Sequence, residues 1–164
     1  MRKIQTFQNI LEIFYALASH GIPVQDLLGA SSKFTRVAMA FNNSFDLSIP
    51  SLELLSYHEY NDQLLELERA FLLPPSSGLE NSQLISTSVY RHVIHGPSPL
   101  DASQIHFLPR LRSALDIAKD SDEGRYWNLV KREAFYVVDA LESASCVLEN
   151  HLIFDENSNS ATSV

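Results

Sequence analysis

The residues best suited to chemistry in this chain are its six histidines. His92 and His95 lie three positions apart, and His106 belongs to the same stretch. Zinc is held in proteins by Cys, His and carboxylate ligands, and a helical site typically follows a His-Glu-x-x-His pattern. The sequence has no such pattern and no cysteine near these histidines. It therefore favours loop histidines that hydrogen-bond to the backbone or face solvent, and it predicts no metal site in this chain.

The single cysteine and the carboxylates on helical segments do not indicate a catalytic centre. Cys146 follows Ser145 in an apolar segment without an activating base, so we expect a buried, inert thiol. The carboxylates concerned are Glu66, Glu68, Glu133 and Glu142. We expect them on solvated faces or in ion pairs with Arg69, Lys131 and Arg132. The residues by themselves indicate a non-catalytic helical module.

The composition restricts the class of protein. The chain has 164 residues, of which 45% are hydrophobic and 20% charged, with only 5 Gly and 7 Pro. These values fit one domain with a core and argue against disorder or a turn-rich sandwich. A net charge of −8 disfavours a nucleic-acid partner. No stretch approaches the roughly 18 apolar residues of a membrane span, so we expect no direct membrane contact.

Five stretches of helical periodicity must position these side chains. Apolar residues recur at steps of three and four over 3–19, 24–42, 52–73, 109–120 and 122–149. The stripe of the first helix comprises Ile4, Phe7, Leu11, Phe14 and Ala18. The stripe of the second comprises Leu27, Phe34, Ala38, Phe41 and Phe45. Before the last helix the stripe comprises Leu108, Leu111, Leu115 and Ala118, and in the last helix it comprises Trp127, Val130, Ala134, Val137, Leu141, Ala144 and Leu148. The pattern predicts an all-α fold, namely a four-helix bundle with an extra short helix. The predicted helical domain covers 1–150, and we expect 151–164 to be a polar, disordered tail.

The stretch of about 74–107 differs from the rest of the chain. Pro74-Pro75 and Gly96-Pro97 are turn-forming pairs, and no helical period crosses the segment. Strands are weakly indicated, because only Ser86–Ile94 alternates β-branched and aromatic residues. We therefore expect a long irregular loop, of a length that is usually functional or disordered.

Several motifs in this order resemble the C-terminal helical domain of the glutamate carboxypeptidase and transferrin receptor family. The strings are Asn61–Phe71 (NDQLLELERAF), Tyr90–Ile94 (YRHVI), Ser113–Asp116 (SALD) and Trp127–Arg132 (WNLVKR). The resemblance is dense from about 57 to 148 and looser before that, where Lys33-Phe34-Thr35 fits a family element. The motif residues, expected to be structural, are Asn61, Asp62, Gln63, Glu68, Arg69, Tyr90, Arg91, His92 and Trp127.

The resemblance implies a transferrin-receptor-like dimerisation domain, which follows a zinc-peptidase-like domain and packs on it. The implied partners are a second copy of the chain, in a homodimer, and that upstream domain. The two zinc ions and the catalytic carboxylate of active members lie upstream, so this chain would hold no cofactor and would be a piece of a larger protein. That parent resembles a zinc-dependent glutamate carboxypeptidase. The alternative is a catalytically dead receptor or protein-sorting adaptor, which differs only in residues outside this chain.

In glutamate-selective members of the family, a Lys-Tyr pair in the long loop holds the substrate's terminal carboxylate. An ungapped comparison from Tyr90 to Pro109 places Ala102 and Ser103 there, which argues against glutamate selectivity. The loop residues expected to border a substrate pocket of the parent are Ser98, Asp101, Ala102, Ser103, Gln104 and His106. Packing of this loop against the neighbouring domain is an equally open interpretation.

Two further features bear on the parent and on self-association. The Arg-Gly-Asp tripeptide by which transferrin receptors bind their ligand is missing, while Asn42-Asn43-Ser44 fits an N-glycosylation acceptor of a lumenal or extracellular, membrane-anchored parent. Tyrosines exceed what one interior stripe per helix can bury; they include Tyr15, Tyr57, Tyr126 and Tyr136. Because tyrosine suits interfaces, we expect a homodimer through the bundle surface rather than through the tail.

Overall fold

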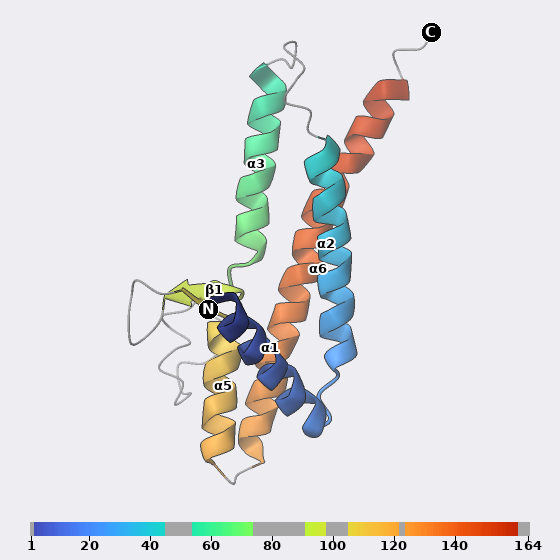
Figure 1. The fold of residues 1–164 in the computed structure, drawn as a ribbon. Helices are drawn as coiled ribbons and strands as arrows, with labels where there is room; N and C mark the ends of the chain where they lie inside the picture. The colour runs from blue at the N-terminus through green and yellow to red at the C-terminus, as the bar shows by residue number, and fades with distance from the viewer. Residues whose placement is uncertain (1, 45–53, 74–90, 98–104, 122–123, 161–164) are drawn as a thin grey trace. The chain divides into compact units, whose positions relative to one another are not determined.

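The computed structural model describes the backbone of residues 2–44, 54–73, 91–97, 105–121 and 124–160. It describes the side chains of 11–43, 58, 60–73, 91–97, 105–121 and 124–149. Its helices are α1 (Arg2–Ser19), α2 (Val24–Ser44), α3 (Leu54–Ala70), α5 (Pro109–Asp120) and α6 (Arg125–Ser160) (Figure 1). The strands are β1 (His95–Pro97) and β2 (Ile105–Phe107). The predicted all-α class is confirmed. Among the described helices, none has the length and apolar character needed to cross a membrane.

The chain divides into two compact units. Unit 1 comprises Met1–Gly29 and Leu73–Val138, and thus α1, the two strands, α5 and the first part of α6. Figure 1 shows α5 and the start of α6 side by side. Both helices bury the stripes predicted from the sequence; those positions are Leu111, Leu115 and Ala118 in α5 and Val130, Ala134 and Val137 in α6. Burying a leucine side chain of this kind contributes about 1.5–3 kcal/mol, so these stripes hold unit 1 together.

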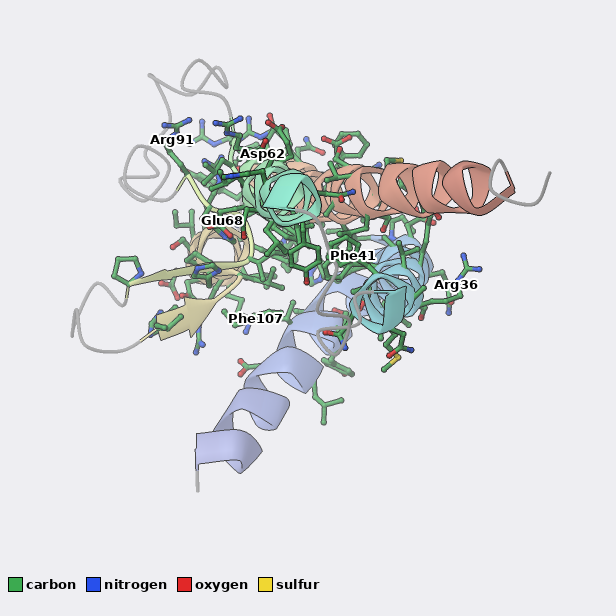
Figure 2. All side chains as sticks on the ribbon, turned by 90° about the horizontal axis from the view of Figure 1, so that it is seen from above. Arg36, Phe41, Asp62, Glu68, Arg91 and Phe107 are labelled. Carbon is green, nitrogen blue, oxygen red and sulfur yellow. The ribbon has the colours of Figure 1, made fainter. Side chains whose placement is uncertain are left out.

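Unit 2 comprises Ala30–Leu72 and Asp139–Val164, which includes most of α2, all of α3 and the end of α6. Its core is formed by Val37, Phe41 and Leu148. The partly buried residues packed against that core are Phe34, Ala38, Tyr60 and Leu67. Figure 2 shows Phe41 on the inner side of α2 and Arg36 on the opposite, outer side. The predicted stripe of the second helix is therefore on the core side.

The prediction of which face of the first helix is buried is wrong. The buried side chains of α1 are Ile13, Ala16 and Leu17, whereas Leu11 and Ala18 of the predicted stripe are exposed. The helix carries apolar residues on more than one side, so spacing alone cannot tell which side packs against the rest of the unit. The buried side lies next to α5, which α1 contacts.

The last helix differs from its prediction at both ends. It was predicted over 122–149 and runs from Arg125 to Ser160. Ser121, directly before the predicted start at 122, is the C-cap residue of α5 and has an extended backbone. The sequence contains no Gly or Pro after Gly124, so nothing in the backbone forces the helix to stop at 149. The division into a domain over 1–150 and a tail over 151–164 stays a prediction.

The stretch predicted as an irregular loop contains a small antiparallel sheet. β1 and β2 pair with Gly96 opposite His106. Each strand has three residues, which is too short for an alternating pattern to stand out in the sequence. The prediction of an entirely irregular segment is therefore wrong over 95–97 and 105–107.

Candidate functional site

The hairpin formed by β1 and β2 brackets the stretch in which the sequence places its substrate-loop candidates. Of these candidates, the structure describes His106, which is half-buried. The others lie outside the described residues; they are Ser98, Asp101, Ala102, Ser103 and Gln104. The structure thus shows one strand before and one strand after the candidate loop, which the sequence did not predict.

Alternation along the strands gives this hairpin one exposed face. His95 lies opposite Phe107, and Pro97 lies opposite Ile105. These four residues are on the exposed face of the hairpin, whereas His106 is on the other face. Ile105 is 75% exposed and Phe107 42%. This face therefore presents large apolar side chains away from the core of unit 1, next to the candidate loop.

Leu108 and Pro109 connect the hairpin to α5. Leu108 adopts a left-handed conformation (φ 49°, ψ 55°), which is uncommon for a residue other than glycine. Its backbone nitrogen donates a hydrogen bond of 2.7 Å to the Ile94 carbonyl, and its side chain is buried. Pro109 begins the helix, where its fixed φ suits the first turn and its missing N–H costs nothing. The backbone conformation of Leu108 and the proline at the start of α5 therefore fix how the chain turns from β2 into the helix.

A buried ion pair follows directly. Arg110, the second residue of α5, donates through Nε to Glu133 Oε2 at 2.8 Å and through Nη2 to Glu133 Oε1 at 3.1 Å. The two side chains are only 3% and 1% exposed. The Arg110 guanidinium also lies 5.9 Å from the centre of the Tyr136 ring, and Arg132 Nη2 lies 3.5 Å from Glu133 Oε1. Fork-like pairing of this kind fixes both partners, so it ties the base of the hairpin to α6.

Five of the motif residues lie on α3 within unit 2. Gln63 Nε2 donates a hydrogen bond of 2.7 Å to the Val147 carbonyl on α6, which joins the two helices. Arg69 forms an ion pair with Glu66, as the sequence predicted. Asn61, Asp62 and Glu68 are exposed. The structure therefore shows a direct packing role for Gln63 among these five.

Three other motif residues belong to unit 1, while Tyr90 lies outside the described residues. Arg91 Nε donates to the Leu73 carbonyl at 3.3 Å, and the Leu73 nitrogen donates to the Arg91 carbonyl at 3.0 Å. Trp127 stacks on His20, with 3.3 Å between ring centres and 11° between ring planes. These motif positions join segments of unit 1 that are far apart in the sequence.

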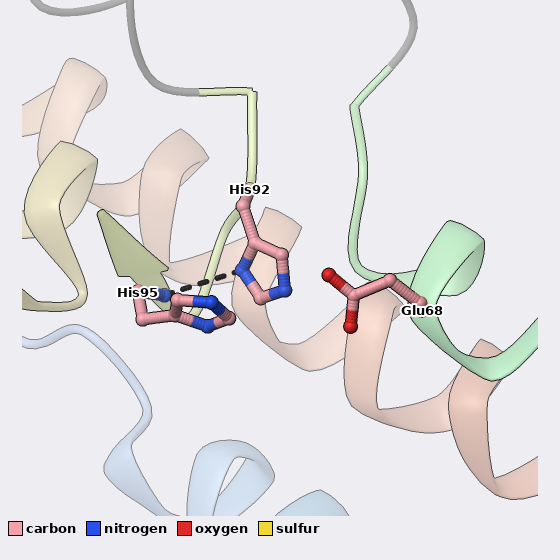
Figure 3. Close-up of side chains that lie close together, drawn as sticks. All are labelled: Glu68, His92 and His95. Carbon is pink, nitrogen blue, oxygen red and sulfur yellow. Dashed lines mark hydrogen bonds between the residues drawn. The ribbon is translucent and has the colours of Figure 1, made fainter. Parts of the chain in front are cut away.

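His92 and His95 lie together, as their spacing indicated, with 3.7 Å between ring centres (Figure 3). The backbone nitrogens of Ile94 and His95 each donate to His92 Nδ1 at 3.2 Å. A backbone N–H can only donate, so Nδ1 must be the accepting nitrogen, and in the neutral ring the proton is on Nε2. In this tautomer neither ring nitrogen of His92 has a lone pair left for a metal. The contacts fit the expectation of a loop histidine hydrogen-bonded to the backbone.

Two expectations from the sequence are wrong. Cys146 is exposed, because the buried side of α6 here contains Ala144, Ser145 and Leu148, and the next position turns outward. Glu133 is buried and pairs chiefly with Arg110, whereas the sequence suggested a solvated carboxylate or a pair with its neighbours. The position of Arg110 between the apolar residues Leu108 and Leu111 was the one sign in the sequence that its side chain is buried.

A family model described as the transferrin receptor-like dimerisation domain matches residues 23–149. The chain belongs to this family. The match includes the hairpin, the Arg110–Glu133 pair and every motif residue named above, whereas α1 lies before it.

Curated relatives of this dimerisation-domain chain are named as peptidases. It is 33% identical to aminopeptidase NAALADL1 of Rattus norvegicus over 135 aligned residues. This alignment covers 81% of this chain and 17% of the relative. It is also 33% identical to the probable glutamate carboxypeptidase LAMP1 of Arabidopsis thaliana over 99 aligned residues. That alignment covers 60% of this chain and 14% of the relative. The chain thus spans about a sixth of the length of the curated relatives it matches.

Proposed function

We propose that this chain is a non-catalytic homodimerisation domain that works as part of a larger protein of the zinc-exopeptidase type. The observation that carries the proposal is the match of the dimerisation-domain family over residues 23–149. The names of the relatives, an aminopeptidase and a probable glutamate carboxypeptidase, support a peptidase parent over a receptor or sorting adaptor. The upstream peptidase-like domain would be the second partner.

Exposed apolar side chains within the matched range support an interface there. Met39 on α2, Leu65 on α3 and Phe135 on α6 are 63%, 57% and 63% exposed. Protein interfaces are enriched in Phe and Met at their centres, whereas a lone apolar side chain on a surface is ordinary. We propose that the second copy covers a surface containing at least one of these three residues.

The hairpin would have a different role in the parent. Its strands flank the candidate loop residues, and its exposed face carries Ile105 and Phe107. We propose that this face packs on the upstream domain and that the loop borders the parent's substrate pocket. With Ala102 and Ser103 in place of a cationic and hydroxyl-bearing pair, the loop would not select a glutamate carboxylate.

The chain itself would bind no zinc in this proposal. Support comes from His92, whose Nδ1 accepts two backbone hydrogen bonds and so leaves no ring nitrogen free to ligate. Elemental analysis of the purified chain after dialysis against zinc should find no stoichiometric metal. Tightly held zinc that is lost in His92→Ala or His95→Ala would contradict this part of the proposal.

The homodimer is tested by light scattering coupled to gel filtration over a dilution series. The expected result is a dimer mass at high concentration and dissociation on dilution. Met39→Glu, Leu65→Glu and Phe135→Glu are then compared, and at least one should weaken association by about tenfold or more, as loss of an interface centre does.

The matched control is Tyr15→Glu, since Tyr15 is a 79% exposed side chain on α1, outside the family match. It should leave the dissociation constant unchanged. A monomer mass at every concentration up to the millimolar range would refute homodimerisation of this chain. Loss of the dimer in Tyr15→Glu alone would refute the placement of the interface within 23–149.

A further inference from the structure

One side of α6 is exposed along the middle of the helix. The exposed residues recur at steps of three and four, which places them on one face of this continuous helix. They are Asn128, Lys131, Phe135, Asp139, Glu142 and Cys146. The other face carries buried residues such as Val130, Ala134 and Val137. We call the six exposed residues the outer stripe of α6.

Phe135 is the large apolar residue of the outer stripe. Its side chain is 63% exposed, and its ring centre lies 6.4 Å from that of the half-buried Tyr136. A single exposed apolar side chain is ordinary, so the exposure of Phe135 alone decides nothing. Its setting is more specific, because Lys131 lies one helical turn before it and Asp139 one turn after it, on the same face.

The charges of the outer stripe are separated by sign. Lys131 lies before Phe135, whereas Asp139 and Glu142 lie after it. Within the residues that the structure describes, none of these three charged side chains forms an ion pair. A stripe that is basic at one end and acidic at the other is complementary to a reversed copy of itself. The charge order therefore indicates a second copy of the chain as the occupant of this face.

We propose, on the basis of the homodimer proposed above, that the outer stripe of α6 pairs in antiparallel orientation with the same stripe of a second copy. The twofold axis passes at Phe135, so that this side chain meets its own counterpart. Lys131 meets Asp139 of the partner subunit, and the symmetry repeats this pair on the other side of the axis.

The spacing along the helix suits an antiparallel pair. Lys131 and Asp139 are each four residues from Phe135, or about 6 Å along the helix, so they lie at the same level when the second helix runs in reverse. Asn128 and Glu142 are each seven residues away, which brings the amide of one copy to the carboxylate of the other. In a parallel pair each charge would face its own copy and be repelled. The charge order thus selects the antiparallel orientation.

The size of the outer stripe sets the expected strength of the contact. From Asn128 to Cys146 the stripe is about 27 Å long, on a helix about 10 Å wide. This is well below the roughly 800 Å² that each partner buries in a standard interface. A dimer held by this stripe should therefore dissociate on dilution.

Charge reversal tests the two ion pairs. Lys131→Glu or Asp139→Lys alone puts like charges into both pairs and should raise the dissociation constant about tenfold or more, measured by light scattering over a dilution series. An equimolar mixture of the two variants should associate about as tightly as the wild type, because each variant then meets opposite charges on the other. The matched control is Arg36→Glu, which makes the same change of charge at an exposed position of α2 and should leave the dissociation constant unchanged.

Disulfide cross-linking tests the orientation. The variants are made in a Cys146→Ser background, because the native thiol is exposed, and are oxidised at a concentration where the wild type is a dimer. Phe135→Cys should cross-link to itself, since a disulfide needs Cα atoms about 4.4–6.8 Å apart and the axis brings the two copies together. Lys131→Cys should not, because its two copies lie eight residues, or about 12 Å, apart along the helices. An equimolar mixture of Lys131→Cys and Asp139→Cys should give a cross-linked dimer.

The outcomes separate this interface from the homodimer itself. The antiparallel α6 pair is wrong, and the proposed homodimer stands, if the wild type is a dimer whose dissociation constant neither charge reversal changes, or if Lys131→Cys cross-links to itself. Equal weakening in Arg36→Glu also overturns the pair, because the effect would then follow net charge. A wild type that stays monomeric at every concentration up to the millimolar range refutes both the pair and the homodimer.

Discussion

Unit 1 has a buried charged pair, whereas the pair that joins two helices of unit 2 is exposed. In unit 1, Arg110 and Glu133 are almost completely buried and bonded through two hydrogen bonds. In unit 2, the pair that joins α2 to α6 is Lys33 with Glu149, at 3.2 Å, and both side chains are more than a third exposed. The interior of unit 2 holds aromatic contacts instead, with Phe41 stacked on Tyr60 at 4.9 Å and Phe34 meeting Phe71 edge to face at 5.7 Å.

The difference shows that environment decides what a salt bridge does. A buried pair costs desolvation, but loss of one partner leaves a charge that the interior cannot solvate. A surface pair is solvated either way, so its removal changes little. We therefore expect unit 1 to depend on the integrity of one pair and unit 2 on the volume of its aromatic side chains.

The largest effect should come from breaking the buried pair. Glu133→Ala leaves the Arg110 guanidinium without its carboxylate and should lower the free energy of unfolding by about 4 kcal/mol. Chemical denaturation followed by circular dichroism measures this change. Because Arg110 holds the base of the hairpin, exchange of the Leu108 amide should also accelerate.

The double variant Arg110→Met with Glu133→Leu is the control for that prediction. Replacing both charges by apolar groups of similar size removes the desolvation problem, so stability should recover to near or above the wild-type value. If the double variant is as unstable as Glu133→Ala, cavity formation rather than the unpaired charge is responsible, and the proposed contrast between the units fails.

The aromatic core of unit 2 should give the next largest effect. Phe41→Ala removes a side chain that is 4% exposed and stacked on Tyr60, and it should cost about 3 kcal/mol. Arg36→Ala on the outer side of the same helix is the matched control and should stay within about 0.5 kcal/mol of the wild type. Equal costs for the two variants, measured by denaturant unfolding, would show that α2 does not pack by this face.

The elements of the fold could largely be predicted from the sequence, because helical spacing and helix-ending residues are local signals. The α5 stripe and the α6 stripe from Val130 to Leu148 are on buried faces as predicted. The inner face of α1 could not be chosen, since its apolar residues lie on several sides and only contact with α5 decides between them. The three-residue strands were missed because their stability comes from pairing across the loop rather than from a pattern within either strand.

The candidate site was less predictable. Arg110 and Glu133 are 23 residues apart, and charge alone does not tell a buried pair from two solvated side chains. His20 was not singled out either, since its contact with Trp127 joins helices far apart in the chain. Loop candidates such as Ala102 and Ser103 came from resemblance to a family, and the described residues leave their role a prediction.

The surface pair of unit 2 should show a small effect. Lys33→Ala and Glu149→Gln, separately or together, should each lower stability by about 0.5 kcal/mol or less, and raised salt should remove most of that difference. A cost of several kcal/mol for either variant would mean that this pair acts like the buried pair of unit 1, and the comparison would need to be abandoned.

The smallest effect should be the pH response of the exposed pair between α1 and α5 in unit 1. Lys119 Nζ donates to Glu12 Oε1 at 2.8 Å, and this hydrogen bond and the attraction between the charges lower the pKa of the Glu12 carboxyl below its ordinary value of 4.5. A carboxyl whose pKa is lower in the folded chain stabilises the fold above its unfolded pKa, and this contribution disappears as the pH falls. Glu12→Gln should therefore leave a slightly flatter loss of stability below about pH 4.5, measured by urea unfolding at several pH values. The control is Asp116→Asn, because Asp116 is exposed on α5 beside Glu12 and forms no ion pair with a described residue. An unchanged pH profile in Glu12→Gln would show that Lys119 does not hold this carboxylate in solution.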